Sequence, residues 1–125
     1  MKERGRMEQL WAHEKYRVMF HSQKHYNEIR EVLKGAASYE TVEELIMEAI
    51  KVSPTKGSMM NAIDHMWGYF RNYSDEDEKA EYRRLKEHLL EGEVEAEALL
   101  YFLAALSKKY DERYLLNSSI LESYI

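Results

Sequence analysis

The sequence has no cysteine and only one proline among its 125 residues. Without cysteine the chain cannot form disulfides, use a thiol nucleophile, or hold zinc or an iron–sulfur cluster through thiolates. Its five glycines form no phosphate-binding loop, and it contains neither a GxSxG nor an HExxH motif. These absences favour a non-catalytic module, and we predict no cofactor and no metal.

Long apolar runs are also missing. No stretch approaches the roughly 18 apolar residues that a membrane-spanning helix needs. The opening residues, MKERGRMEQLW, contain no apolar region of the kind found in signal peptides. We therefore expect a cytoplasmic protein with no membrane contact.

Positive charge is scarce outside the N-terminal third of the chain. The net charge is −5, yet residues 1–34 carry 8 Lys/Arg against 5 Asp/Glu, whereas residues 35–125 carry 10 against 18. An anionic partner is therefore expected to bind the N-terminal third.

Helical periodicity is present almost throughout. Apolar residues make up 45% of the chain and recur at helical spacing, with no sustained alternation typical of strands. This pattern predicts an all-α fold, in which residues 1–125 form a single compact bundle of six to seven helices. The apolar run ALLYFLAAL, residues 98–106, is expected to be the central sixth helix.

Capping and breaking residues set the expected bounds of the other helices. Thr41 with Glu44 has capping-box spacing, and Ser74 with Asp77 suggests a second N-cap. The remaining signals predict helices over residues 7–21 and 23–33, a third ending before Pro54, a fourth over residues 58–72, a fifth ending at Gly92, and a short helix with a packed tail after residue 110.

Lys15 is a misfit in the first helix, LWAHEKYRVMFH. It lies about 40° from both Trp11 and Met19 on a helical wheel, inside the apolar arc. Either its stem packs on Trp11 while the ammonium reaches solvent or Glu14, or it is a fixed cation for an anionic ligand.

The fourth helix, SMMNAIDHMWGYFR, carries a second polar stripe. Asn61 and His65 are four residues apart and could hydrogen-bond one another, leaving His65 a satisfied structural histidine. His21 and His25 share that spacing, but no third ligand is in register for a metal.

A glycine inside this helix indicates that another group lies close to the helix backbone there. Gly68 costs roughly 1 kcal/mol relative to alanine there, so we expect a neighbouring helix or a ligand against it. Phe70 should point into the core and Tyr69 toward the rim. We further expect Trp11 and Lys15 to face Asn61, His65 and Gly68 across one shallow site.

These motifs resemble those of the YbgA-like family, bacterial domains of unknown function. The resemblance rests on Trp11, Lys15, Tyr16, His21 and Tyr26, then NAIDHMWGYFR, then YDERYLLN, and covers residues 9–117. It implies a set of binding positions for an anion or RNA: Trp11, Lys15, Tyr16, His21, Asn61, His65, Gly68, Tyr69 and Arg71, with Phe70 in the same motif. No catalytic role is implied for any of them.

The resemblance also suggests a partner. The family occurs alone or fused C-terminal to a thiouracil-desulfidase-like domain, which implies contact with transfer RNA or with a desulfidase-like protein. We therefore expect an RNA-associated module. The alternatives are an anionic-ligand or catalytic pocket between the first and fourth helices, and a scaffold or oligomerisation domain for a partner enzyme.

Overall fold

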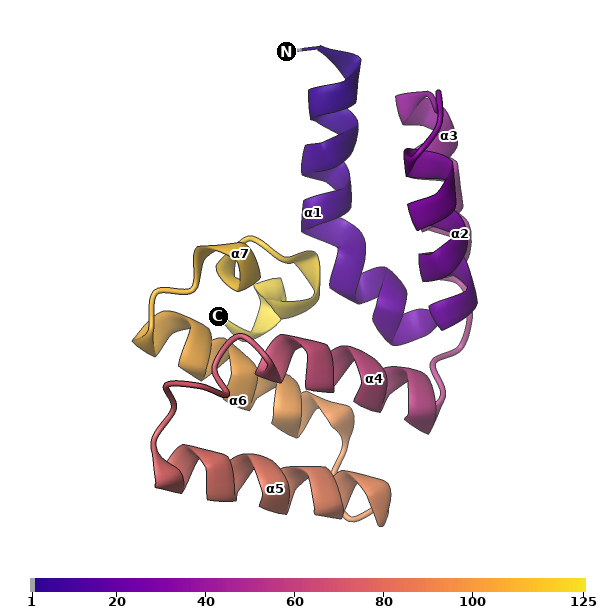
Figure 1. The fold of residues 1–125 in the computed structure, drawn as a ribbon. Helices are drawn as coiled ribbons and strands as arrows, with labels where there is room; N and C mark the ends of the chain where they lie inside the picture. The colour runs from indigo at the N-terminus through magenta and orange to yellow at the C-terminus, as the bar shows by residue number, and fades with distance from the viewer. Residues whose placement is uncertain (1) are drawn as a thin grey trace.

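The computed structural model describes residues 2–125, and this part of the chain is all-α, as predicted (Figure 1). It contains seven α-helices, one 3₁₀ helix and no strand. The elements are α1 (Glu3–His21), α2 (Gln23–Leu33), α3 (Tyr39–Ala49), α4 (Lys56–Trp67), α5 (Glu76–Leu90), α6 (Ala96–Lys109), α7 (Arg113–Leu116) and η1 (Ser119–Tyr124).

The helices form two groups, α1–α3 and α4–η1, which meet mainly through the long helix α1 (Figure 1). Along its length it packs against α2 and α3, while its C-terminal part also packs on α4. Helix α6 packs against both α4 and α5, and η1 contacts α1 as well as α6. The tail therefore ties the first helix to the sixth.

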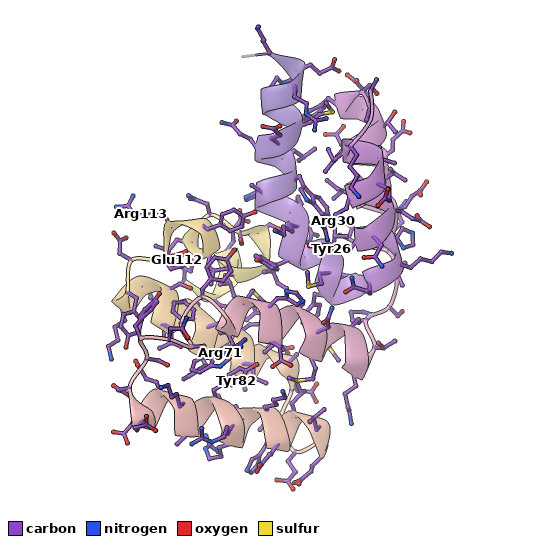
Figure 2. All side chains as sticks on the ribbon, in the orientation of Figure 1. Tyr26, Arg30, Arg71, Tyr82, Glu112 and Arg113 are labelled. Carbon is purple, nitrogen blue, oxygen red and sulfur yellow. The ribbon has the colours of Figure 1, made fainter. Side chains whose placement is uncertain are left out.

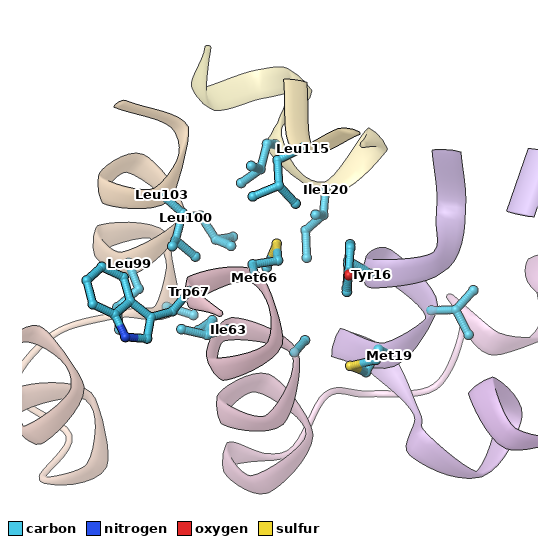
Figure 3. Close-up of a cluster of buried hydrophobic side chains, with 14 of the residues drawn as sticks. Tyr16, Met19, Ile63, Met66, Trp67, Leu99, Leu100, Leu103, Leu115 and Ile120 are labelled. Carbon is cyan, nitrogen blue, oxygen red and sulfur yellow. The ribbon is translucent and has the colours of Figure 1, made fainter. Parts of the chain in front are cut away.

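Apolar side chains of α4 fill the junction between these groups (Figure 3). Ile63 and Met66 are fully buried, and Trp67 stacks on Tyr82 of α5 with ring centroids 4.3 Å apart. From α6, α7 and η1 come the buried side chains Leu99, Leu100, Leu103, Leu115 and Ile120.

Helix α6 packs in the core, as its apolar sequence predicts, and buries half of its 14 residues. Seven of its residues are buried, among them Leu99 and Leu103. One face remains open to solvent, where Tyr101 is 58% exposed.

The predicted starts of α1, α3 and α5 are wrong by a few residues, and α1 begins at Glu3 instead of Met7. Helix α3 is capped by Ser38, whose hydroxyl accepts a hydrogen bond from the Thr41 backbone N–H at 3.1 Å, so Thr41 is not the cap. Helix α5 is capped by Asp75, which forms a capping box with Glu78. In α5 the cap is the residue that has a glutamate at the third helical position, where Glu78 can accept a hydrogen bond from the backbone of Asp75.

The fourth helix begins earlier and ends earlier than predicted. Thr55 and Ser58 form a capping box at its start, and regular helix ends at Trp67. The following residues continue as turns with helical Gly68 at the C-cap (φ −52°, ψ −26°). Phe70 is fully buried and Tyr69 partly buried, as expected.

In residues 2–125, no helix has the length and apolarity required to cross a membrane.

Candidate functional site

Two phenol hydroxyls meet where α1 passes the end of α4. The hydroxyl oxygens of Tyr16 and Tyr69 lie 2.7 Å apart, so one donates to the other. The ring of Tyr114, on α7, lies 6.2 Å from that of Tyr16 and 5.9 Å from that of Tyr69. Three elements distant in sequence thus bring three tyrosines together.

Lys15 lies at the edge of these rings. Its Nζ is 5.4 Å from the centroid of Tyr16 and 5.8 Å from that of Tyr114, within cation–π range. Burial, followed by the positive charge of Arg30, lowers the pKa of the Lys15 ammonium. Lys15 therefore lies near a second cation.

Glu14 does not neutralise Lys15, contrary to one expectation from the sequence. Its buried carboxylate accepts hydrogen bonds from the Ser119 hydroxyl at 3.1 Å and from Arg17 at 3.4 Å. Within residues 2–125, Lys15 forms no ion pair with a carboxylate. The reason is rotational, because consecutive helical residues point about 100° apart.

Arg30 and Tyr26 project from α2 into the space beside α1 (Figure 2). The Arg30 guanidinium carbon lies 5.7 Å from the Tyr26 ring centroid, and Tyr26 packs on Trp11 with centroids 5.5 Å apart. Trp11 thus contacts Tyr26. We call the whole group the tyrosine–cation cluster: Lys15, Arg30, Tyr16, Tyr26, Tyr69 and Tyr114.

Tyr16, Tyr69 and Tyr114 of this cluster stay protonated at neutral pH. Burial, and then the bond with Tyr69, raise the pKa of Tyr16. Burial also raises the pKa of Tyr69, although its bond with Tyr16 acts in the opposite direction. The pKa of Tyr114 is raised by burial and then by Tyr69 and Tyr26. Each phenol can therefore donate a hydrogen bond.

A second group of candidate residues lines a hollow where α1, α2 and α4 meet. The hollow has a volume of about 570 Å³, and His21, Gln23, Asn61 and His65 are among its lining residues. A smaller hollow of about 310 Å³ shares Asn61 and His65, and is otherwise lined by Asp64, Gly68 and Arg71.

Asn61 does not pair with His65, contrary to the sequence prediction. Its amide donates to the side-chain oxygen of Gln23, whose own amide donates to Asn27 at 3.0 Å. His65 is exposed, and its side chain forms no hydrogen bond within the part of the chain described here. It is therefore not a satisfied structural histidine.

The two histidines at the α1–α2 junction are oriented by other partners. His21 Nδ1 donates to the Val52 carbonyl oxygen at 2.8 Å, and His25 Nδ1 lies 2.8 Å from the Ser22 hydroxyl. Residues 2–125 contain no group of three or more His, Asp or Glu side chains placed to hold a metal ion.

Within residues 2–125, no neighbouring helix packs closely against Gly68, so the helix alternative of that expectation is wrong, while the ligand alternative stays a prediction. A methyl group at this position would lie 3.1 Å from the His65 carbonyl oxygen and 3.5 Å from Arg71 Nη2. Both atoms belong to its own turn. The contact with the carbonyl oxygen would be tight and that with Arg71 ordinary, and Arg71 lies beside Tyr82 (Figure 2).

The structure does not gather the nine predicted positions into one site. Trp11, Lys15, Tyr16 and Tyr69 belong to the cluster and its edge, whereas His21, Asn61, His65, Gly68 and Arg71 line the two hollows. The groups adjoin through α4, where Tyr69 follows His65 by one turn, and through α2, where Tyr26 follows Gln23.

Sequence reasoning missed three contributors to these sites. Arg30 follows Tyr26 by four residues, the spacing of helical neighbours, and that was the available signal. Tyr114 lies in the YDERYLLN motif, which supports the resemblance but does not indicate that the Tyr114 side chain belongs to the site. Gln23 carried no signal, because its role depends on the angle between α2 and α4.

One comparison with known proteins identifies the family. Residues 15–124 match the model of a family described as "Protein of unknown function (DUF1722)". The chain belongs to the DUF1722 family. The matched range begins at Lys15 and includes both hollows and the cluster. No curated protein matches the chain significantly, and the same holds for solved structures.

Proposed function

We propose that this DUF1722 protein is a non-catalytic, YbgA-like module of the cytoplasm that binds RNA, with transfer RNA as the expected ligand. One observation carries the proposal. Lys15 and Arg30 form no salt bridge with a carboxylate in residues 2–125, and both lie against tyrosine rings. RNA offers phosphates to such cations and unstacked bases to aromatic rings.

The adjoining hollows support the same ligand. Asn61, His65 and Arg71 present an amide, an imidazole and a guanidinium on the exposed face next to the cluster. These groups can hydrogen-bond base edges and phosphates. Because the chain carries a net charge of −5, binding must depend on this local surface.

A partner enzyme fits the proposal. The resemblance to modules fused with a thiouracil-desulfidase-like domain makes such an enzyme the expected partner, with this chain holding the RNA. Scaffolding of that enzyme without RNA contact is the competing function, and the same titration distinguishes the two.

The test is a titration of bulk transfer RNA, with and without thiouridine, at several salt concentrations. We expect affinity to fall steeply with salt, because binding releases counterions from the RNA and a higher salt concentration reduces the free energy gained by that release. A Lys15→Gln/Arg30→Gln variant should reduce the slope of log affinity against log salt by roughly 1.5, since each lost phosphate contact removes about 0.7–0.9.

The matched control removes two charges elsewhere. Arg83 of α5 and Lys108 of α6 are exposed. An Arg83→Gln/Lys108→Gln variant has the same net charge as the test variant and should bind like the unmodified protein. Binding that is absent at low salt, or equally weakened in both variants, would refute the proposal.

A further inference from the structure

The tyrosine–cation cluster holds two positive charges that the protein leaves without a paired acid. Glu14, next to Lys15 in sequence, binds Arg17 and Ser119. Glu31, next to Arg30, pairs with Lys34 at 2.9 Å. The acids beside both cations are thus engaged elsewhere, and the cluster retains its positive charge.

Burial makes this arrangement costly without a ligand. Lys15 is partly buried against Tyr16 and Tyr114, and Arg30 lies over Tyr26. The two like charges repel one another, and the partly buried Lys15 also loses hydration, whereas Arg30 is exposed to solvent. An anion of charge −2 would neutralise both, whereas an anion of charge −1 would leave one uncompensated.

The cluster also offers hydroxyl donors for such an anion. In the Tyr16–Tyr69 pair one hydroxyl donates to the other, so the acceptor keeps its own hydrogen for a ligand. The Tyr114 hydroxyl forms no hydrogen bond within residues 2–125. Two phenol hydroxyls and two cations can therefore bind several oxygens of one anionic ligand.

We infer that the tyrosine–cation cluster binds a phosphate monoester, such as the terminal phosphate of an RNA strand, in preference to a backbone phosphodiester. A monoester has three terminal oxygens and a charge of about −1.5 to −2 at pH 7. A diester has two such oxygens and a charge of −1. The inference rests on the proposed RNA binding and specifies which part of the RNA the cluster holds.

Glu112 opposes an anion at the edge of the cluster. It immediately precedes α7, and its negative charge adds to burial in raising the pKa of Tyr69. Figure 2 shows it beside α7, across from Tyr26 and Arg30. Removal of this charge should strengthen phosphate binding, which separates an electrostatic site from a merely structural tyrosine cluster.

The experiment compares one single-stranded RNA of about twelve nucleotides in three forms: with a 5′-phosphate, with a 3′-phosphate, and with hydroxyls at both ends. At least one phosphorylated form should bind about tenfold more tightly than the hydroxyl form. Inorganic phosphate should compete with that form and not with the hydroxyl form.

Variants assign the preference to the cluster. Lys15→Gln/Arg30→Gln and Tyr114→Phe should each reduce it, and Glu112→Gln should increase it. The Arg83→Gln/Lys108→Gln control should retain it. Tyr114→Phe keeps the packed ring, so it provides a test even if the double variant folds poorly.

The outcomes separate this inference from the proposed function. Equal affinity for all three RNAs would overturn the inference and leave RNA binding intact. A different result would be binding of uridine monophosphate, displaced by inorganic phosphate, without binding of any oligonucleotide. That result would support the monoester site and overturn the RNA proposal. Absence of all binding would overturn both.

Discussion

Gly68 and Gly57 lie near opposite ends of α4 and differ in what an added methyl group would meet. At Gly57 the nearest atom is the Thr55 hydroxyl oxygen at 3.8 Å, an ordinary contact. At Gly68 the His65 carbonyl oxygen lies at 3.1 Å, close enough that the turn must shift. Only the second position therefore opposes the helix propensity of alanine.

This difference predicts opposite outcomes for two alanine substitutions. Gly57→Ala should stabilise the protein by up to about 1 kcal/mol. Gly68→Ala should change the free energy of unfolding by no more than about 0.5 kcal/mol, because the tight contact with the His65 carbonyl offsets the propensity gain. It should leave RNA binding unchanged, because Arg71 Nη2 would lie 3.5 Å from the new methyl, an ordinary contact distance. Urea unfolding and the salt titration measure both. A Gly68→Ala protein that is as stabilised as Gly57→Ala would contradict the cost assigned to the contact with the His65 carbonyl oxygen.

Side-chain identity alone predicted part of the candidate site. Lys15 could be found because a charged residue inside an apolar arc contradicts the helical pattern. The partner of Asn61 could not be found, since Gln23 belongs to another helix and local spacing favours His65. Contacts within one helix follow from the sequence, whereas contacts between helices depend on their crossing.

At the scale of elements, Glu78 joins the start of α5 to the end of α6. Its carboxylate accepts hydrogen bonds from Lys109 at 2.8 Å, from the Tyr110 hydroxyl, and from the Asp75 backbone N–H at 2.9 Å. Burial raises the pKa of Glu78, but these bonds and the charge of Lys109 together lower it to about 2. The ionised carboxylate is therefore favoured by folding.

This lowered pKa predicts a pH-dependent effect of Glu78→Gln. An unfolded glutamate titrates near 4.5, so the stabilisation is complete above that pH and is lost as pH falls toward 2. The variant should melt at a lower temperature than the unmodified protein at pH 7, and the difference should vanish near pH 2.

The control is Glu76→Gln, two residues earlier on α5. Glu76 is 86% exposed and makes only a 3.6 Å contact with Lys79. Thermal melts from pH 7 to pH 2 should show little difference for this variant. A pH-independent effect of Glu78→Gln would mean that packing, and not the charge, links the two helices.

The existence of the helices was easier to predict than their ends. The bounds of α2 were correct because Ser22 breaks the helix before it and Gly35 follows it. The start of α3 was wrong since Ser38 and Thr41 are both suitable caps. The choice between such caps depends on which apolar residues the rest of the molecule buries, here Val42 and Ile46.

At the scale of the whole molecule, several contacts connect the two groups of helices around α1. The Ser58 hydroxyl of α4 donates to the Phe20 carbonyl oxygen at 2.8 Å. His13 Nδ1 donates to the carbonyl oxygen of Asn117, beyond α7, at 2.6 Å. Leu121 of η1 is fully buried in the shared core. These contacts favour a single cooperative unit, as the sequence predicts for residues 1–125.

The two tryptophans report on the two groups separately. Trp11 lies on α1 against Tyr26 of α2, and Trp67 lies between α4 and α5 against Tyr82. A Trp67→Phe variant leaves only the first probe, and Trp11→Phe leaves only the second. In each variant, urea unfolding followed by fluorescence should have the same midpoint as unfolding followed by helical circular dichroism, because a two-state domain loses all structure together. If fluorescence from Trp11 changed at a lower urea concentration than the circular dichroism of the same sample, α1–α3 would unfold independently and the chain would contain two units.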